Sequence, residues 1–353
     1  MKFGILYIPD YYPERYKSSS HYYGEMLEQI QFCEEIGLDG IWFAEHYVGG
    51  YAFPSPPIFA TAVAQKTKRL RLGTGVILLP LTNPVKVAEE YAMLDVLSNG
   101  RLDFGVGRGI LRAEYDLFWI NPNESQGRYH EALDVVLQAW TQDELTYTGK
   151  YFTVDRVKAL PKPVQQPHPP IWAAAVASPE SFIWAGQRGY HAMVVPFAYP
   201  TFGPLRELID LYRRTLVENG HDPASKEVQG VYHLYVGEDD AQVRREAGPE
   251  LDRYLKFFIS LDKPWQSADY KAYGKGLGEI FERLSYDVMD QGDCFIFGNP
   301  ERCIQRIKNI KQGLGLTYML FEVNYGGMAH EKVMKSLERF AKYVMPHVRN
   351  GGQ

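Results

Sequence analysis

The chain has 353 residues, of which 45% are hydrophobic and 23% are charged, and its formal net charge is −5. These fractions are those of an ordinary globular protein, so they exclude a disordered chain. Nucleic-acid binding needs a basic face, and the sequence holds no dense run of lysine and arginine, so we expect no nucleic-acid partner. A small neutral ligand, or an anion recognised locally, fits this charge better.

Three cysteines, Cys33, Cys294 and Cys303, are scattered and odd in number. This usage favours a reducing compartment over a disulfide framework. Met1 leads directly into a short apolar strand that lacks the features of a signal peptide, and nowhere do about 18 apolar residues run together. We therefore expect a cytoplasmic protein that does not span a membrane.

Apolar runs alternate with helical patterns along the chain. Strands are expected at residues 2–8, 39–44, 70–79, 102–106, 171–175, 192–195, 228–236 and 316–323. Helices are expected at about 23–37, 58–66, 84–98, 125–142, 178–189, 204–219, 241–258 and 300–311, with a closing helix to about 347. Opening prolines such as Pro84 and closing glycines such as Gly189 mark these helix ends. A β-hairpin is expected at 145–154, ahead of a proline-rich connection at 161–170.

Eight alternations of strand and helix predict a (β/α)₈ TIM barrel, taken as a single domain over residues 1–353. An open doubly wound sheet is the alternative. Its usual mark is a GxGxxG turn after the first strand, where this sequence has Pro9-Asp10-Tyr11-Tyr12-Pro13. Residues 259–299 interrupt the pattern and predict an insertion late in the chain, either a lid or a packed surface excursion.

In such a barrel the carboxyl ends of all strands face one mouth, so residues far apart in sequence meet there. The polar and glycine residues expected at the mouth are Glu45, His46, Gly75, Arg108, Ser178, Glu322 and Asn324. Aromatic residues are candidates to line the same pocket on position alone: Tyr7, Tyr11, Tyr12, Tyr47, Phe197 and Tyr325.

Gly107-Arg108-Gly109 follows the fourth expected strand. Glycines there let backbone N–H groups approach a ligand closely, and a guanidinium between them can make a bidentate contact with phosphate. The alternative is a tight turn with Arg108 in solvent.

Glu45-His46 follows the second expected strand, where an imidazole could act as a general base or hydrogen-bond donor. The alternative is a structural pair. The histidine spacings do not suit zinc, so no metal site is expected. Glu45 with Glu322 could also form the acid/base pair of a barrel glycosidase, although such an enzyme has no need of the Gly-Arg-Gly strand end.

A second anion-binding junction is expected at residues 176–181, between a strand and a helix, where free N–H groups and hydroxyls occur together. Arg128, at the start of an earlier helix, could join Arg108 in holding a dianionic phosphate. The alternatives are that Arg128 is an exposed neighbour of Glu124 and that Ser178 is only a helix N-cap before Pro179.

These motifs, taken together, resemble the bacterial-luciferase-like flavin-dependent monooxygenases over nearly the whole chain. The resemblance rests on Asp39-Gly40-Ile41-Trp42-Phe43-Ala44-Glu45-His46, Gly73-Thr74-Gly75-Val76-Ile77-Leu78-Leu79-Pro80 with Asn83-Pro84-Val85, Leu94-Asp95, Ser98-Asn99-Gly100-Arg101, Gly105-Val106-Gly107-Arg108-Gly109, Pro170-Ile171-Trp172, Ser178, Trp184-Ala185, Gly189 and Phe297-Gly298-Asn299-Pro300-Glu301.

The resemblance implies a (β/α)₈ barrel that binds reduced FMN supplied by a separate flavin reductase, and that oxygenates a small organic substrate with O₂ through a C4a-(hydro)peroxide of the flavin. It implies that His46 is the active-site base and Glu45 its companion. It places a cis peptide bond between Gly75 and Val76 under the isoalloxazine ring. The implied cofactor-binding set is Gly75, Val76, Gly107, Arg108, Ile110, Arg128, Val176, Ala177, Ser178 and Ser181, with the two arginines on the phosphate.

Two departures limit what the resemblance carries over. Gly107 stands where the luciferase branch has a reactive cysteine, so no thiol-dependent behaviour is expected. Ala177 stands where that branch has a second glutamate.

The fold family also contains F420-dependent oxidoreductases, which transfer a hydride, and a non-catalytic flavin-binding protein is a third alternative. His46 separates the last of these, because a storage protein needs no base.

A homodimer is expected from the helices at 58–66 and 84–97, a region through which family members commonly associate. These helices carry small or apolar faces, namely Ala60, Ala62, Ala64, Val87, Ala88 and Tyr91. Packing of the same faces against the barrel is the alternative.

Overall fold

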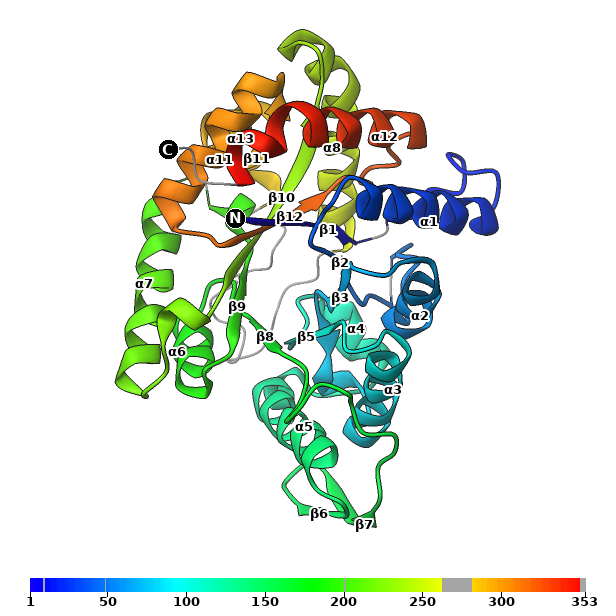
Figure 1. Cartoon of the computed structure of the whole chain (residues 1–353), viewed down its shortest axis with the longest axis vertical. Coiled ribbons are helices and arrows are strands. Elements are labelled where there is room, and N and C mark those ends of the chain that lie inside the picture. The colour runs from blue at the N-terminus through cyan, green and yellow to red at the C-terminus, as the bar shows by residue number, and fades with distance from the viewer. Residues whose placement is uncertain (9, 48, 200, 262–280, 350–353) are drawn as a thin grey trace.

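Eight parallel strands form a closed barrel in the computed structural model, which describes residues 1–8, 10–47, 49–199, 201–261 and 281–349 (Figure 1). In order around the barrel they are β1 (Lys2–Tyr7), β2 (Gly40–Phe43), β3 (Arg71–Thr74), β5 (Leu102–Gly107), β8 (Ile171–Ala174), β9 (His191–Val194), β10 (Val228–Val236) and β12 (Tyr318–Glu322). Pairing of β12 with β1 closes the ring. The TIM-barrel prediction is confirmed.

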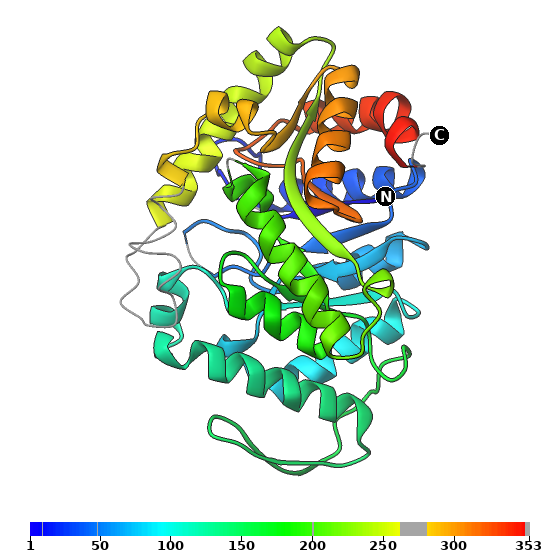
Figure 2. The ribbon, with the colours of Figure 1, turned by 90° about the vertical axis from the view of Figure 1, so that its left-hand side faces the viewer.

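Helices cover the outside of the barrel, as the alternating pattern predicts (Figures 1 and 2). They are α1 (Ser19–Glu35), α2 (Pro56–Lys66), α3 (Pro84–Leu97), α5 (Ser125–Thr141), α6 (Pro179–Arg188), α7 (Phe202–Glu218), α8 (Asp240–Leu261), α11 (Pro300–Leu314) and α12 (His330–Arg339), with a π-helical turn at Phe340–Val344 leading into α13 (Met345–Arg349). Local chemistry sets several ends. The Asn83 side chain caps α3 ahead of Pro84, and Gly189 ends α6 in the left-handed conformation that suits glycine.

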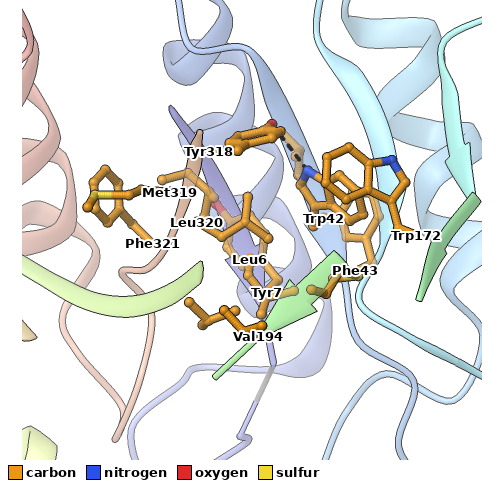
Figure 3. Packing of buried hydrophobic residues seen from close by; sticks show 14 of the residues in the cluster. Leu6, Tyr7, Trp42, Phe43, Trp172, Val194, Tyr318, Met319, Leu320 and Phe321 are labelled. Atoms are coloured by element: carbon orange, nitrogen blue, oxygen red, sulfur yellow. Dashed lines mark hydrogen bonds between the residues drawn. The ribbon is translucent and has the colours of Figure 1, made fainter. Parts of the chain in front are cut away.

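Aromatic side chains fill the interior of the barrel beside the strands (Figure 3). Trp42 and Trp172 pack edge to face at 5.1 Å between ring centroids, and the Trp42 indole N–H donates to the Tyr318 hydroxyl at 3.2 Å. A Cβ on Gly73 would lie 2.1 Å from the Trp42 ring, so only glycine leaves room for that indole. Because this core is packed, open space in the barrel lies nearer the carboxyl ends of the strands.

The predicted hairpin is confirmed as β6 (Leu145–Thr148) and β7 (Thr153–Val157). It lies beneath α5 at the bottom of Figures 1 and 2. The Glu131 carboxylate on α5 accepts N–H bonds from Lys150, Tyr151 and Phe152 at 2.7–3.1 Å. These bonds fix the hairpin to the helix.

Three elements differ from the prediction. The strand expected at 70–79 is broken into β3 and β4 (Ile77–Leu78). A short helix, α4 (Arg112–Leu117), follows β5. Within the predicted 259–299 insertion, α8 continues to Leu261 and a further strand, β11 (Phe295–Gly298), pairs with the last residues of β10, so that range is too wide as an insertion. Residues 262–280 of the predicted insertion lie outside the described residues.

The helix faces proposed for dimerisation pack within the chain. Ala60, Ala64, Val87, Ala88 and Tyr91 are all buried in the isolated chain, which follows the barrel-packing alternative. Ala62 is exposed, and the large exposed apolar side chains of α2 and α3 are Ile58, Met93, Val96 and Leu97. All three cysteines are free and buried. Within the described chain, every helix is too short or too polar to cross a bilayer.

Candidate functional site

A cavity of about 620 Å³ opens at the carboxyl ends of the strands. Its described lining includes all the predicted catalytic and cofactor-binding residues except Arg128 and Ala177: Glu45, His46, Gly75, Val76, Gly107, Arg108, Ile110, Val176, Ser178 and Ser181. They come from the ends of β2, β3, β5 and β8. The barrel topology therefore brings together residues that are far apart in the sequence.

Glu45 and His46 follow β2 directly and are both nearly buried. One Glu45 carboxylate oxygen accepts the Leu78 N–H at 2.7 Å and the other accepts the Tyr47 hydroxyl. Burial raises the pKa of Glu45 above its ordinary value, because the charged form loses its water. This carboxylate fixes the end of β4 to the chain just after β2.

His46 has a buried carboxylate partner that the sequence did not predict. Its Nδ1 lies 2.9 Å from Oε1 of Glu114, a fully buried residue of α4, and the same oxygen accepts the Tyr47 N–H at 3.2 Å. An ionised carboxylate there favours the proton on Nδ1, which leaves Nε2 as the acceptor. The pair has the geometry of a general base held by an acid.

The backbone at the end of β3 approaches that of β5 closely. The peptide bond between Gly75 and Val76 is cis, as the resemblance implies, and both residues line the cavity. A Cβ on Gly107 would lie only 2.5 Å from Cγ2 of Val76. Glycine at 107 therefore leaves room for the Val76 side chain in this part of the cavity wall.

Another part of the lining carries groups suited to an anion. Arg108 belongs to it, as do Ser178 and Ser181 at the start of α6. Within the described chain, the Ser178 side chain accepts no N–H bond from the helix and lies instead 3.0 Å from the Ser181 hydroxyl. The positive end of the helix and a guanidinium thus face one cavity, a combination that fits a phosphate group.

Arg128 and Ala177 do not line this cavity. The Arg128 Nε lies 2.9 Å from a Glu124 carboxylate oxygen, and its guanidinium stands over the Tyr151 ring of the hairpin, 5.2 Å from the centroid. Arg128 is therefore a partner of Glu124, as in the alternative interpretation of the sequence. From α5, the cavity receives Gln126, Tyr129 and His130, which the sequence analysis did not select.

The remaining wall is apolar. Leu6, Ile8, Met193, Phe197, Phe258 and Phe281 are part of its lining, together with Tyr254. Of the aromatic candidates only Phe197 is among the lining residues. Side-chain alternation explains one of the errors: Leu6 faces the cavity, so Tyr7 points outward and donates to Gln29 on α1.

Glu322 and Asn324 are likewise absent from the described lining, which corrects the predicted mouth. Glu322 is buried beside His233, with 3.2 Å between the carboxylate and Nε2, and lies 3.4 Å from the Tyr254 hydroxyl. Because Glu45 lines the cavity and Glu322 does not, the glycosidase pair loses its geometric basis. Within the described chain no cluster of three or more potential ligands could hold a metal ion.

The loops after β1 and β2 are joined next to His46. Asp10 and Tyr51 form an isolated antiparallel bridge, and the Tyr11 N–H donates to the Gly50 carbonyl at 3.0 Å. The Tyr51 ring stacks on His46 at 4.3 Å between centroids. The imidazole is therefore held by Glu114 at its edge and by Tyr51 on its face.

Residues 1–318 match the family model described as luciferase-like monooxygenase. The chain belongs to the luciferase-like monooxygenase family. Among its relatives, the oxygenase component of the flavin-dependent trigonelline monooxygenase of Acinetobacter baylyi is 30% identical over 92% of this chain and 89% of its own length. The F420-dependent glucose-6-phosphate dehydrogenase of Amycolatopsis mediterranei is 28% identical over 95% and 98%.

Solved structures of the family share the fold. Monooxygenase RslO1 from Streptomyces bottropensis superposes with a TM-score of 0.85 at 29% identity, over 98% of this chain and 99% of that one. The oxygenating constituent of 3,6-diketocamphane monooxygenase from Pseudomonas putida, solved with FMN, gives 0.82 at 18% identity over 99% and 98%. The family thus contains both flavin-dependent monooxygenases and F420-dependent oxidoreductases.

Proposed function

We propose that this chain is the oxygenase component of a two-component monooxygenase, using reduced FMN and O₂ to oxygenate a small organic substrate. The observation that best supports this function is the composition of the cavity lining. Groups suited to an anion (Arg108, Ser178, Ser181) line the same cavity as the cis peptide bond between Gly75 and Val76, Gly107 and a set of apolar side chains. These are the features that a phosphorylated planar cofactor and an apolar substrate require.

Arg108 and the start of α6 would hold the phosphate, and the backbone at Gly75, Val76 and Gly107 would lie against the ring system. Bound reduced FMN supplies the electrons that activate O₂. His46, held by Glu114, would accept or return a proton at Nε2 on the substrate side of the cavity. The aromatic and aliphatic lining would exclude water and stray protons from the site.

A flavin reductase is the partner that this chemistry requires, because each turnover consumes one reduced FMN that has to be supplied again. The trigonelline relative, named as an oxygenase component, supports that division of labour. A homodimer is a further proposal. The exposed Ile58, Met93, Val96 and Leu97 on α2 and α3 support it, and the sedimentation velocity of the purified chain tests it.

Hydride transfer with reduced F420 is the second candidate, favoured by the 28% identical dehydrogenase. Anaerobic titration of the apoprotein with reduced FMN and reduced F420, followed by rapid mixing with oxygen, separates the two. Tight reduced-FMN binding, with flavin reoxidation slower than in free solution, supports the monooxygenase. Binding of F420 alone would replace it with the oxidoreductase. Fast, unprotected reoxidation of bound flavin would indicate a storage protein.

A further inference from the structure

His130 is a cavity residue whose side chain has no role in the proposed mechanism so far. It lies on α5, and its ring is stacked on that of Trp184 at 4.5 Å with 7° between the planes. Trp184 is one helical turn after Ser181 on α6, so the two side chains are neighbours on one helix face. The imidazole is thereby placed at the part of the lining suited to an anion, between α5 and α6.

The ring nitrogens of His130 are available to a ligand. No hydrogen bond joins them to another of the described residues, and the ring is half-buried. Burial, followed by the positive charges of Arg188 and Arg108, lowers the pKa of His130 to about 4. The ring is therefore neutral near pH 7, with one donor and one acceptor nitrogen. The side chains that face it are those two arginines, Trp184 and Tyr129.

We propose that His130 binds the terminal phosphate of the flavin, together with Arg108 and the Ser178–Ser181 start of α6. This inference rests on the proposed function and names the side chain that α5 contributes to the phosphate site. Arg128, the residue that the sequence favoured for this task, is paired with Glu124 and stands over the hairpin. His130 is directed into the cavity from the same helix.

The charge of the phosphate decides how His130 responds. A phosphate monoester such as FMN is largely a dianion near pH 7, because its second pKa is about 6. A dianion next to His130 offsets the nearby arginine charges and raises the pKa of the imidazole, so we expect FMN binding to be accompanied by proton uptake. A phosphodiester, as in F420, carries one negative charge and draws that proton less strongly. Proton uptake therefore distinguishes the two cofactor classes at this position.

The test compares FMN with riboflavin, which lacks the phosphate, in anaerobic titrations of the reduced flavins against the full-length protein. We expect His130→Ala to weaken FMN binding about 10-fold or more and to leave riboflavin binding unchanged. We expect His130→Gln, which keeps a neutral donor, to recover part of that loss. Calorimetry in buffers of different ionisation enthalpy should show proton uptake on FMN binding by the wild type and none by His130→Gln.

His191→Ala is the matched control. His191 also stacks on a tryptophan, Trp172, at 4.4 Å, and burial likewise lowers its pKa to about 4, but it does not line the cavity. Equal losses in the two alanine variants, or an equal loss for both flavins in His130→Ala, would overturn the assignment. If the wild type binds FMN no better than riboflavin, the phosphate site and hence the proposed function fail. If the wild type prefers FMN to riboflavin and His130→Ala keeps that preference, the assignment of His130 fails and the proposed function stands.

Discussion

Replacing Glu114 with glutamine tests whether the orientation of His46 matters to the chemistry. Oε1 of Glu114 serves both the His46 ring and the Tyr47 N–H. A glutamine oxygen in that position keeps both bonds but removes the negative charge, and it leaves the NH₂ where Oε2 has no partner among the described residues. The reversed amide loses the Tyr47 bond and donates to Nδ1, which moves the imidazole proton to Nε2.

Either placement removes a charged hydrogen bond worth about 1.5–3 kcal/mol. If His46 acts as the base, the rate constant for oxygen-dependent flavin reoxidation should fall about 10- to 150-fold. This rate constant is measured from the flavin absorbance after rapid mixing of the reduced-flavin complex with oxygenated buffer. Flavin affinity should change less than twofold, because Glu114 does not line the cavity. The unfolding free energy should fall by about 1–3 kcal/mol for the unpaired buried group.

Glu131→Gln is the control, since Glu131 also accepts backbone N–H bonds but holds the hairpin. It should leave reoxidation unchanged. A folded, flavin-loaded Glu114→Gln protein that reoxidises flavin at the wild-type rate would refute the role of the His46–Glu114 pair.

Four other substitutions have defined outcomes. Arg108→Ala should weaken FMN binding by about 1.5–3 kcal/mol in fluorescence titrations, and unchanged affinity would remove Arg108 from the site. His46→Ala should bind flavin nearly normally but slow reoxidation about 100-fold or more, whereas loss of folding in urea melts would make His46 structural. Gly107→Ala, which sets a methyl group against Val76, should weaken flavin binding and destabilise the fold by about 1–3 kcal/mol, and wild-type values for both would contradict the close approach. Burial raises the pKa of Asp10 to about 7, so the folded chain holds this proton more tightly than the unfolded chain and stability is lost as pH rises from about 4 to about 7. Asp10→Asn should remove that loss, worth up to about 4 kcal/mol in urea melts, and melts that follow the wild type across this range would exclude it.

Periodicity and end signals predicted the barrel because each strand is nearly continuous in apolar residues and each helix has a marked start or stop. β11 was missed because Phe295–Gly298 is only a four-residue run, and short apolar runs carry no period of their own. α4 was missed for a similar reason, at six residues. Both elements owe their place to tertiary contacts that the local sequence does not encode.

The candidate site followed from strand ends, but its supporting residues did not. Glu114 lies on the unpredicted α4, 68 residues from His46, and no spacing rule links them. Strand-end position alone also placed Glu322 at the mouth wrongly, because it does not say which way a side chain faces. Arg128 shows the same limit within a helix. A first-turn position fits both a cavity ligand and a partner of Glu124, and the hairpin ring at Tyr151 lies over its guanidinium.

The bridge between Asp10 and Tyr51 couples the loops after β1 and β2, so that a shift in one loop displaces the other. Substitutions at Tyr11 or Tyr12, which do not line the cavity, would therefore shift the Tyr51 ring against which His46 rests. They should change the reaction rate without changing the side chains that a substrate contacts. Mutations aimed at substrate selectivity are better made at Phe197, which lines the cavity and comes from neither loop.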